Sequence, residues 1–265
     1  MDKQKFLQQR KMAGIKKMVK NKGIVFIGDI HGRDEWIEIA NEALLKFKHI
    51  VFVGDYVDSF DVRPVLIKHN LEAIIGFKIQ HPDNVTLLLG NHDWAYIYDQ
   101  SGISGFKWQM WQDYKKIFKD NIDLFDVAWG YTNPRTKKYT LATHAGLTYK
   151  YWTKVILPKL KDPEDKLHNL TDGGDLQKYK IHDILNLMKG DDGMWKVGAM
   201  RGGVGTPSPL WADYLELLDD PYPDINQVFG HTASGLPCLD QFGDYFIAKV
   251  DGWYNNKISH MQINI

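Results

Sequence analysis

The sequence lacks several features that would assign it to a particular class of protein. It has one cysteine, Cys238, so it cannot form an internal disulfide and offers no pair of thiolates for a metal site. It has no run of about 18 apolar residues, which argues against a transmembrane helix. Lysine and arginine together number 33, as do aspartate and glutamate, so no net charge draws the chain to nucleic acid or to an anionic membrane. We therefore expect neither membrane insertion nor general nucleic-acid binding.

The first 22 residues are basic and lack the apolar stretch of a secretory signal. Lysines interrupt every apolar run between Lys11 and Lys22. We expect a basic N-terminal helix or tail over residues 1–22, with a loose apolar stripe under a basic face. The lone cysteine and the absence of a signal predict a cytoplasmic protein.

Short β-branched and aromatic runs alternate with helical patterns early in the chain. Residues 24–27 and 50–53 predict buried strands, and apolar residues recur at helical spacing over residues 33–47 between them. A second helical pattern over residues 65–80 precedes a third strand at 85–89. This order predicts parallel neighbouring strands. Later strand candidates are 139–142, 225–229 and 245–250.

Two long intervals separate the predicted strands. Residues 94–135 are rich in aromatic side chains at helical spacing, and residues 150–222 are mixed and interrupted by glycine and proline. The chain has neither a repeat nor a convincing linker. We therefore expect a single domain over residues 1–265 with both intervals as insertions or cap regions. We expect the aromatic side chains of the first interval chiefly to bury one another, and Trp211 and Tyr214 to belong to the core.

Polar residues follow five of the predicted strands. Because the carboxyl ends of strands in an α/β sheet form the edge at which ligands bind, these side chains would converge there. Each cluster alone fits an ordinary turn or helix cap, but five together predict one shared site. The clusters are Gly28-Asp29-Ile30-His31-Gly32, Gly54-Asp55-Tyr56-Val57-Asp58, Gly90-Asn91-His92-Asp93, Thr143-His144-Ala145-Gly146 and Gly230-His231-Thr232.

The side chains in these clusters are those that divalent metal ions prefer. Carboxylate, imidazole and amide groups together suit Mn²⁺, Fe²⁺ or Zn²⁺, and a shared carboxylate can hold two ions about 3.5 Å apart. Two adjacent cations stabilise the charge of a transferred phosphoryl group and lower the pKa of a bridging water. The pattern therefore predicts a two-metal phosphoesterase.

In their order along the chain, the five clusters resemble the motifs of the calcineurin-like metallophosphoesterase superfamily. The similarity spans Gly28 to Thr232. It is greatest to the Ser/Thr protein phosphatase branch and its bacterial and phage relatives, which include symmetric dinucleoside tetraphosphate hydrolases. The resemblance implies an α/β fold of the metallophosphoesterase type, a β-sandwich flanked by helices, with helical insertions.

The resemblance also implies a metal ligand set. Asp29 and His31 would hold the first metal, and Asp55 would bridge both. The cofactors implied are two divalent ions, with Mn²⁺ favoured and Fe²⁺, Zn²⁺ or Ni²⁺ as alternatives. The second metal would be completed by Asn91, His144 and His231.

A general acid is implied by the same resemblance. His92 would donate a proton to the leaving-group oxygen, and Asp58 would orient it. Elementary chemistry supports this pair, because a leaving alkoxide needs a proton and a histidine paired with a carboxylate can supply one near neutral pH.

Two positions depart from the protein phosphatase pattern. Ser59 stands where those enzymes have an arginine that binds the substrate phosphate, and Ala233 stands where phosphodiesterase-like branches have a second histidine. Arg201 lies where the family often has another phosphate-binding arginine, and a guanidinium matches phosphate oxygens well. Arg63 is a second candidate, although a place at the start of a helix fits it better.

These features predict a hydrolase that acts on phosphoesters of a small molecule, a nucleotide or a phosphoprotein. A phosphomonoesterase similar to protein phosphatases, with a metal-bridging hydroxide and His92 as general acid, fits them best. A dinucleoside polyphosphate hydrolase or phosphodiesterase is the alternative, because Ser59 replaces the expected arginine and residues 94–129 offer aromatic surface for a base. A non-catalytic metal-binding scaffold is a further alternative, which the presence of every implied ligand opposes.

Overall fold

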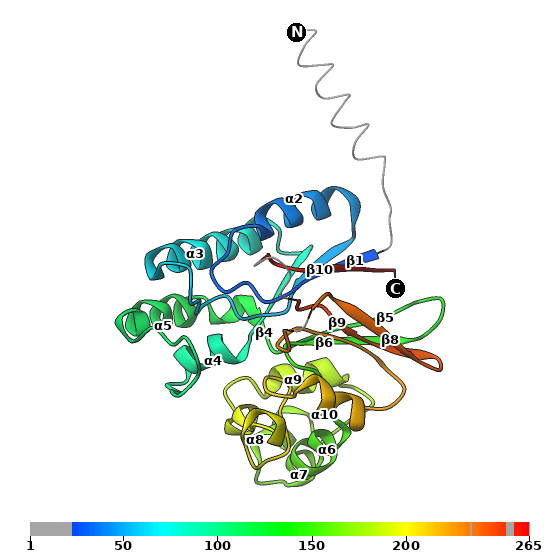
Figure 1. Ribbon diagram of the computed structural model, residues 1–265. Coiled ribbons are helices and arrows are strands. Elements are labelled where there is room, and N and C mark those ends of the chain that lie inside the picture. Colours follow the sequence, from blue (N-terminus) through cyan, green and yellow to red (C-terminus); the bar gives the residue numbers. More distant parts are fainter. Residues whose placement is uncertain (1–22, 234, 253–256, 265) are drawn as a thin grey trace, which may run out of the picture.

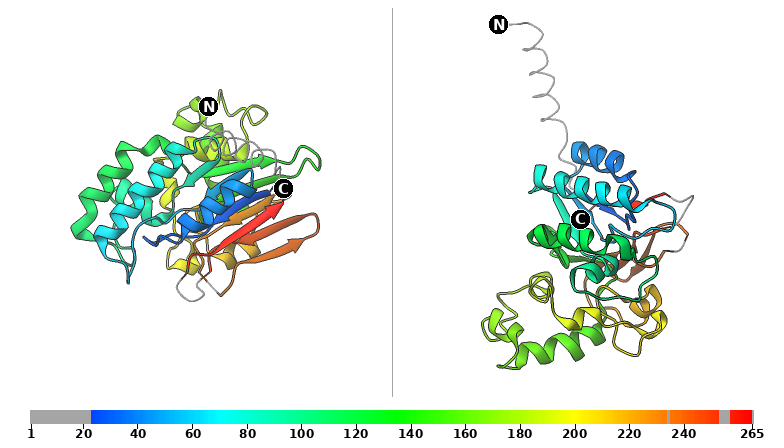
Figure 2. Two further views of the ribbon diagram at one scale, coloured as in Figure 1. Left: turned by 90° about the horizontal axis from the view of Figure 1, so that it is seen from above. Right: turned by 90° about the vertical axis from the view of Figure 1, so that its left-hand side faces the viewer.

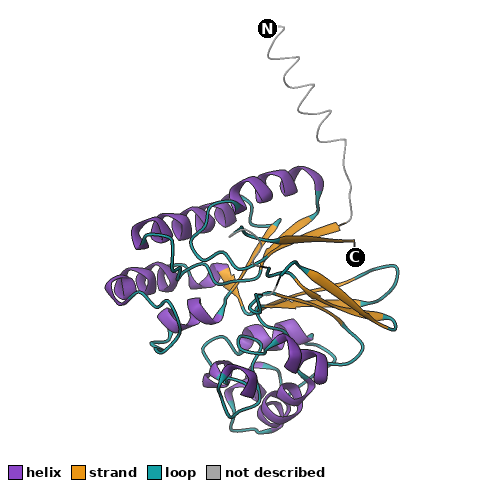
Figure 3. Cartoon of the chain, in the orientation of Figure 1, coloured by secondary structure: helices purple, strands orange, loops and turns teal. Residues whose placement is uncertain are grey.

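Two mixed β-sheets form the centre of the computed structural model, which describes residues 23–233, 235–252 and 257–264 (Figures 1 and 3). The helix or tail predicted for residues 1–22 lies outside the described residues. The strand order is β10-β1-β2-β3-β4 in the first sheet and β5-β6-β7-β9-β8 in the second. The strands are β1 (Gly23–Ile27), β2 (His49–Phe52), β3 (Val85–Leu88), β4 (Phe125–Asp126), β5 (Ala128–Thr132), β6 (Tyr139–Thr143), β7 (Asn226–Phe229), β8 (Cys238–Phe242), β9 (Tyr245–Lys249) and β10 (His260–Asn264).

Strand β1 is buried on both faces, which is why its sequence is a continuous apolar run. Ile24 and Phe26 pack in an apolar cluster with Val228 of the second sheet, so the two sheets form a sandwich. Val25 and Ile27 point the other way, into the larger core beneath the helices. Strands β1, β2 and β3 are parallel, which confirms the prediction from the β-α-β order.

Helices cover the outer face of the first sheet (Figure 1). Trp36 at the start of the first helix packs edge-to-face on Phe52 and Phe77, which joins that helix to β2 and to the next helix. These helices are α2 (Trp36–Lys46), α3 (Pro64–Gln80), α4 (Asn91–Ile97) and α5 (Trp111–Asp120), with the 3₁₀ turns η1 (Trp108–Met110) and η2 (Ile122–Leu124) on either side of α5.

A second group of helices lies between β6 and β7 in the sequence and gathers below the second sheet in Figure 1. The sandwich is thus flanked by helices on both sides, as the resemblance implied. The group comprises α6 (Tyr149–Tyr151), the π-helix η3 (Trp152–Ile156), α7 (Leu157–Lys161), α8 (Lys166–Leu170), α9 (Ile181–Leu187), η4 (Asp192–Trp195), η5 (Ala199–Arg201) and α10 (Tyr214–Asp219).

Several strands differ from the sequence prediction. The final strand, β10, runs antiparallel to β1, so the end of the chain lies beside its first strand (Figure 2, left). The helical part of residues 94–135 ends at Leu124, and β4 and β5 in the rest of that range belong to the two sheets. The division into one domain with two insertions stays a prediction. Within the part of the chain that the structure describes, no helix is long and apolar enough to cross a membrane.

Candidate metal centre

The five polar clusters meet at the carboxyl ends of their strands. Most of their candidate ligands line one cavity of about 500 Å³, and His144 is fully buried beside it. Four of the site residues are held with positive φ, namely His31 (46°), Asp55 (52°), Asp58 (61°) and His231 (62°). Left-handed backbone at residues other than glycine costs about 1–3 kcal/mol and clusters at functional sites, which fits the chemistry predicted here.

Asp29, His31 and Asp55 form one candidate ligand group, with one donor atom from each residue within 4.8 Å of the others. The Nδ1 atom of His31 lies 3.0 Å from the carbonyl oxygen of Val57 and 2.7 Å from that of Asp58. Carbonyl oxygens only accept, so Nδ1 carries the proton and Nε2 keeps its lone pair. His31 Nε2 lies 3.8 Å from Asp55 Oδ2, so its lone pair and the carboxylate could bind the same cation.

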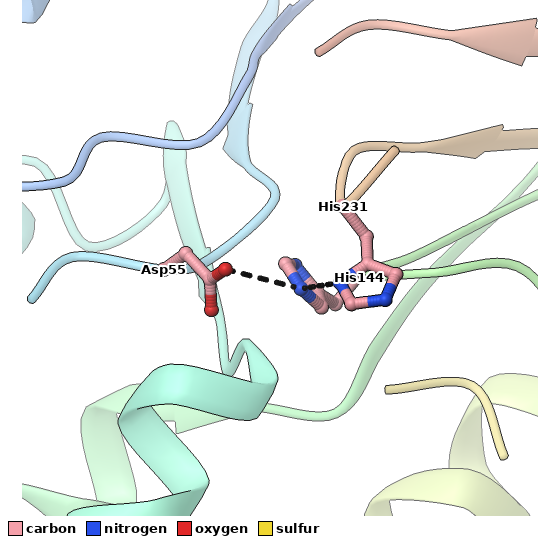
Figure 4. Close-up of side chains that lie close together, drawn as sticks. All are labelled: Asp55, His144 and His231. Atoms are coloured by element: carbon pink, nitrogen blue, oxygen red, sulfur yellow. Dashed lines mark hydrogen bonds and ion pairs between the residues drawn. The ribbon is translucent and has the colours of Figure 1, made fainter. Parts of the chain in front are cut away.

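A second candidate group consists of Asp55, His144 and His231, which approach one another in Figure 4. His144 Nδ1 donates to the carbonyl oxygen of Val53 at 2.9 Å, so its Nε2 also keeps a lone pair. This Nε2 lies 2.9 Å from Asn91 Oδ1, 3.1 Å from His231 Nδ1 and 3.5 Å from Asp55 Oδ2. Asp55 belongs to both groups, as a bridging ligand would.

The donor set fits a pair of divalent cations. The lone pair of His144 Nε2 faces the oxygens Asn91 Oδ1 and Asp55 Oδ2, which is unfavourable without a positive charge between them. Nitrogen, carboxylate and amide ligands suit Mn²⁺, Fe²⁺ and Zn²⁺.

Carboxylate repulsion in the cavity supports the same conclusion. Asp29, Asp55 and Asp251 are buried, with 7%, 2% and 4% of their surface exposed. Burial together with the charges of Asp251 and Asp55 raises the pKa of Asp29 well above its usual range. Burial and the charge of Asp55 raise the pKa of Asp251 to about 7. A bound cation would relieve this repulsion.

Asp251 was not singled out from the sequence. It lies two residues beyond the end of β9, lines the cavity, and has a buried Oδ2 atom without a hydrogen-bond partner among the described residues. The signal that could have found it is its position, because it is an aspartate at the end of a strand.

His92 and Asp58 form a hydrogen-bonded pair beside the two ligand groups. His92 Nδ1 lies 2.9 Å from Asp58 Oδ2, and its other nitrogen, Nε2, lies 4.0 Å from Asp55 Oδ2. Burial lowers the pKa of His92, but Asp55 and the hydrogen-bonded Asp58 outweigh it and raise the pKa to about 9. Asp58 holds Nδ1, so Nε2 is the nitrogen that faces the ligand groups in the cavity.

The loops that carry these side chains are braced by Asp93, whose side chain is fully buried. Its two oxygens accept hydrogen bonds from the backbone N–H groups of Gly90, Asp55 and Tyr56 at 2.8–2.9 Å. The sequence analysis quoted Asp93 within its motif but gave it no role.

Two glycines leave room for the ligands. A Cβ atom on Gly90 would lie 2.1 Å from Asp55 Oδ1, and one on Gly230 would lie 2.3 Å from Asp29 Oδ1. Both distances are far below contact distance, so any larger residue would displace a candidate ligand.

The two candidate phosphate-binding arginines are placed differently. Arg201 lines the cavity, donates to Thr232 Oγ1 at 2.9 Å, and pairs with Asp213 at 3.0 Å. Arg63 precedes α3, is exposed, and is not among the described residues that line the cavity. The structure brings Arg201 to the site and leaves Arg63 outside it.

The aromatic residues of the cavity come from an unexpected segment. Trp94 and Tyr96 are buried in the main core, and the expectation that this segment buries its own rings holds for them. Trp195 and Trp211 line the cavity instead. Trp211 was predicted to belong to the core. It packs against the core and also borders the cavity.

Comparisons with known proteins agree with this architecture. Residues 23–257 match the family model described as calcineurin-like phosphoesterase. A cold-active protein-tyrosine phosphatase of a psychrophile, Shewanella sp., is similar in structure with a TM-score of 0.50 and 16% identity, over 88% of this chain and 72% of that one. A second structure of a cold-active protein tyrosine phosphatase has a TM-score of 0.48 and 15% identity, over 86% and 70% of the two chains. At 16% identity, the likeness to the first of these structures concerns the fold alone.

Proposed function

The chain belongs to the calcineurin-like phosphoesterase family of metal-dependent phosphoesterases, and we propose that within it the chain is a phosphomonoesterase with two divalent ions, Mn²⁺ by preference. One observation carries this proposal. Two ligand groups that share Asp55 lie next to the His92–Asp58 pair, with 4.0 Å between His92 Nε2 and Asp55 Oδ2. Hydrolysis of a phosphoester with a basic leaving alkoxide needs these two components, charge stabilisation at phosphorus and a proton for the leaving group.

In this mechanism the residues have separate tasks. Asp29, His31 and Asp55 would hold one ion, and Asp55 with Asn91, His144 and His231 the other. The bound ions supply Lewis-acid stabilisation of the phosphoryl charge and an acidified water.

The proton transfer belongs to the His92–Asp58 pair. As water attacks phosphorus and the ester P–O bond breaks, His92 Nε2 donates its proton to the leaving oxygen, because Asp58 holds Nδ1 and orients the ring. Arg201 contributes a cation at the rim for the phosphate oxygens.

The charge of the cavity favours a monoester over a dinucleoside polyphosphate. Among the described residues that line it, Arg201 is the only lysine or arginine, and it is already paired with Asp213. A tetraphosphate chain carries charges beyond those at the metal centre and would need further basic side chains.

The proposal is tested by comparing substrates on one preparation. The protein is stripped with a chelator, Mn²⁺ is restored, and kcat/KM is measured on p-nitrophenyl phosphate, its bis-ester and diadenosine tetraphosphate. We expect Mn²⁺-dependent hydrolysis with kcat/KM at least about tenfold higher for the monoester, a difference of about 1.4 kcal/mol in transition-state binding. A large preference for the diester or for the tetraphosphate would overturn the proposal.

A further inference from the structure

We propose that the cavity contains a subsite for a planar aromatic group of the substrate, formed by Trp195 and Trp211. This inference rests on the proposed function, because the phosphate of the same molecule would occupy the metal centre. The substrate class it names is a phosphate monoester whose alcohol carries a single aromatic ring.

The two indoles border the candidate ligands directly. Trp211 packs edge-to-face on His231 with 5.8 Å between ring centroids. Trp195 packs on Trp211 with 5.0 Å between centroids and an angle of 90° between the rings. Two perpendicular rings form a corner in which a third ring can stack on one indole and place its edge against the other.

The corner is held in place by Ser208, which is fully buried. Its hydroxyl donates to the carbonyl oxygen of Met194 at 2.7 Å, directly before Trp195. Its own carbonyl oxygen accepts from the N–H of Trp211 at 2.9 Å. Ser208 therefore ties together the backbone next to Trp195 and the backbone of Trp211, and a corner held before substrate arrives lowers the entropy cost of binding.

The rest of the cavity suits an uncharged ring. Residues 101–104, which line another part of it, have the sequence Ser-Gly-Ile-Ser and bring no charged side chain. Arg201 is paired with Asp213, so the corner offers no unpaired cation to a second anionic group. A cavity of about 500 Å³ is large enough for a phosphate and one ring group.

The test compares two esters that differ in aromaticity and little else. Benzyl phosphate and cyclohexylmethyl phosphate have similar bulk and similarly basic leaving alkoxides. We expect kcat/KM with Mn²⁺ to be about tenfold higher for benzyl phosphate, mainly through a lower KM, since stacking on an aromatic side chain gives gains of this order. In Trp195→Leu the ratio should fall close to one. In Trp108→Leu, which removes a tryptophan that is 62% exposed and outside the described lining of the cavity, the ratio should stay near ten.

Equal kcat/KM for the two esters in the wild-type protein would overturn the subsite and leave the hydrolase assignment intact. If neither ester is hydrolysed, the proposed function is in doubt, and calorimetric titration with benzylphosphonate and cyclohexylmethylphosphonate still tests the subsite. Tighter binding of the aromatic phosphonate that is lost in Trp195→Leu supports it, and equal binding overturns it.

A separate observation concerns Tyr96, and from it we infer that this residue positions the His92–Asp58 pair. The Tyr96 hydroxyl donates to Asp58 Oδ1, while the other oxygen, Oδ2, is bound by His92. The same hydroxyl accepts from the backbone N–H of Lys107 at 2.7 Å. Asp58 is therefore held from two sides, and its carboxylate cannot rotate without breaking a hydrogen bond.

The surroundings of Tyr96 make it a rigid support. Its side chain is fully buried, and its ring stacks on Phe106 with 4.3 Å between centroids and 7° between planes. Phe106 and Lys107 follow residues 101–104, which line the cavity, with Gly105 between them. Tyr96 thus joins that loop to the residue that orients His92.

Tyr96→Phe keeps the ring and removes only the hydroxyl. We expect kcat to fall about tenfold on methyl phosphate, whose leaving alkoxide needs a proton, and less than about threefold on p-nitrophenyl phosphate, whose leaving phenolate does not. Tyr114→Phe is the matched control, because it removes another buried tyrosine hydroxyl, one that donates to the Pro64 carbonyl oxygen at 2.8 Å. An equal loss on both esters, or no loss on methyl phosphate, would overturn the positioning role.

Discussion

Asp55→Asn is expected to lower kcat/KM for phosphate monoesters by about 10³-fold or more. Without the bridging carboxylate the ions are bound poorly, and the transition state loses several kcal/mol of the stabilisation that they provide. Asp55 Oδ2 lies 3.5 Å from His144 Nε2 and 3.8 Å from His31 Nε2, and Asp55 is the residue that both ligand groups share. Asparagine keeps the shape of the side chain but has no charge and only one oxygen. It therefore cannot serve two cations.

Steady-state kinetics and metal analysis together check this expectation. After desalting in Mn²⁺, the wild-type protein should retain about two ions per chain, as in other two-metal sites, and Asp55→Asn one or none. Asp113→Asn is the matched control, since Asp113 is 53% exposed and its ion pair among the described residues is with Lys68 at 3.4 Å. Activity within tenfold of wild type, at unchanged metal content, would show that Asp55 is not a shared ligand.

The strands that carry the site could be predicted because burial on two faces leaves a local signal. In β1, β2 and β3 nearly every residue is buried, so each appears as a continuous apolar run followed by a polar cluster. The meeting of the polar clusters could be predicted from these strands, because the carboxyl ends of parallel strands lie along one edge of the sheet.

The strands at the margins of the sheets leave no such signal. In β8 and β10 exposed residues alternate with ones that are partly buried or, at Ile263, buried. The pairing of β10 with β1 joins residues over 230 positions apart, from Gly23 to Asn264. Pairing at that separation depends on the folded sheet, which a local pattern does not encode.

Other residues that line the cavity also lack a local sequence signal. Trp211 and Arg201 lie in a long irregular segment, so only the fold places one on the core and both at the cavity. Asp251 escaped notice for a related reason. It lacks the glycine that marks Asp29 and Asp55, and its burial against Asp29 depends on β9 lying beside β7.

His92→Asn is expected to lower kcat about 10²- to 10³-fold on methyl phosphate, the usual contribution of a general acid, and less than about tenfold on p-nitrophenyl phosphate. The reason is the leaving group. Methoxide is strongly basic and departs only with a proton, whereas p-nitrophenolate departs without one. His92 is placed to give that proton, because Asp58 holds Nδ1 at 2.9 Å and Nε2 faces the ligand groups.

The metal content of His92→Asn separates proton donation from metal binding. His92 is adjacent to a candidate ligand, Asn91, but lies in neither ligand group, so the variant should retain as many ions as the wild-type protein. His69→Asn, at an exposed histidine of α3, controls for the substitution itself. A loss of activity that is equal on both esters and accompanied by loss of metal would make His92 part of the metal centre. A loss confined to the ester with the basic leaving group, at full metal content, requires a proton donor at this position, and the described geometry offers His92 Nε2 for that role.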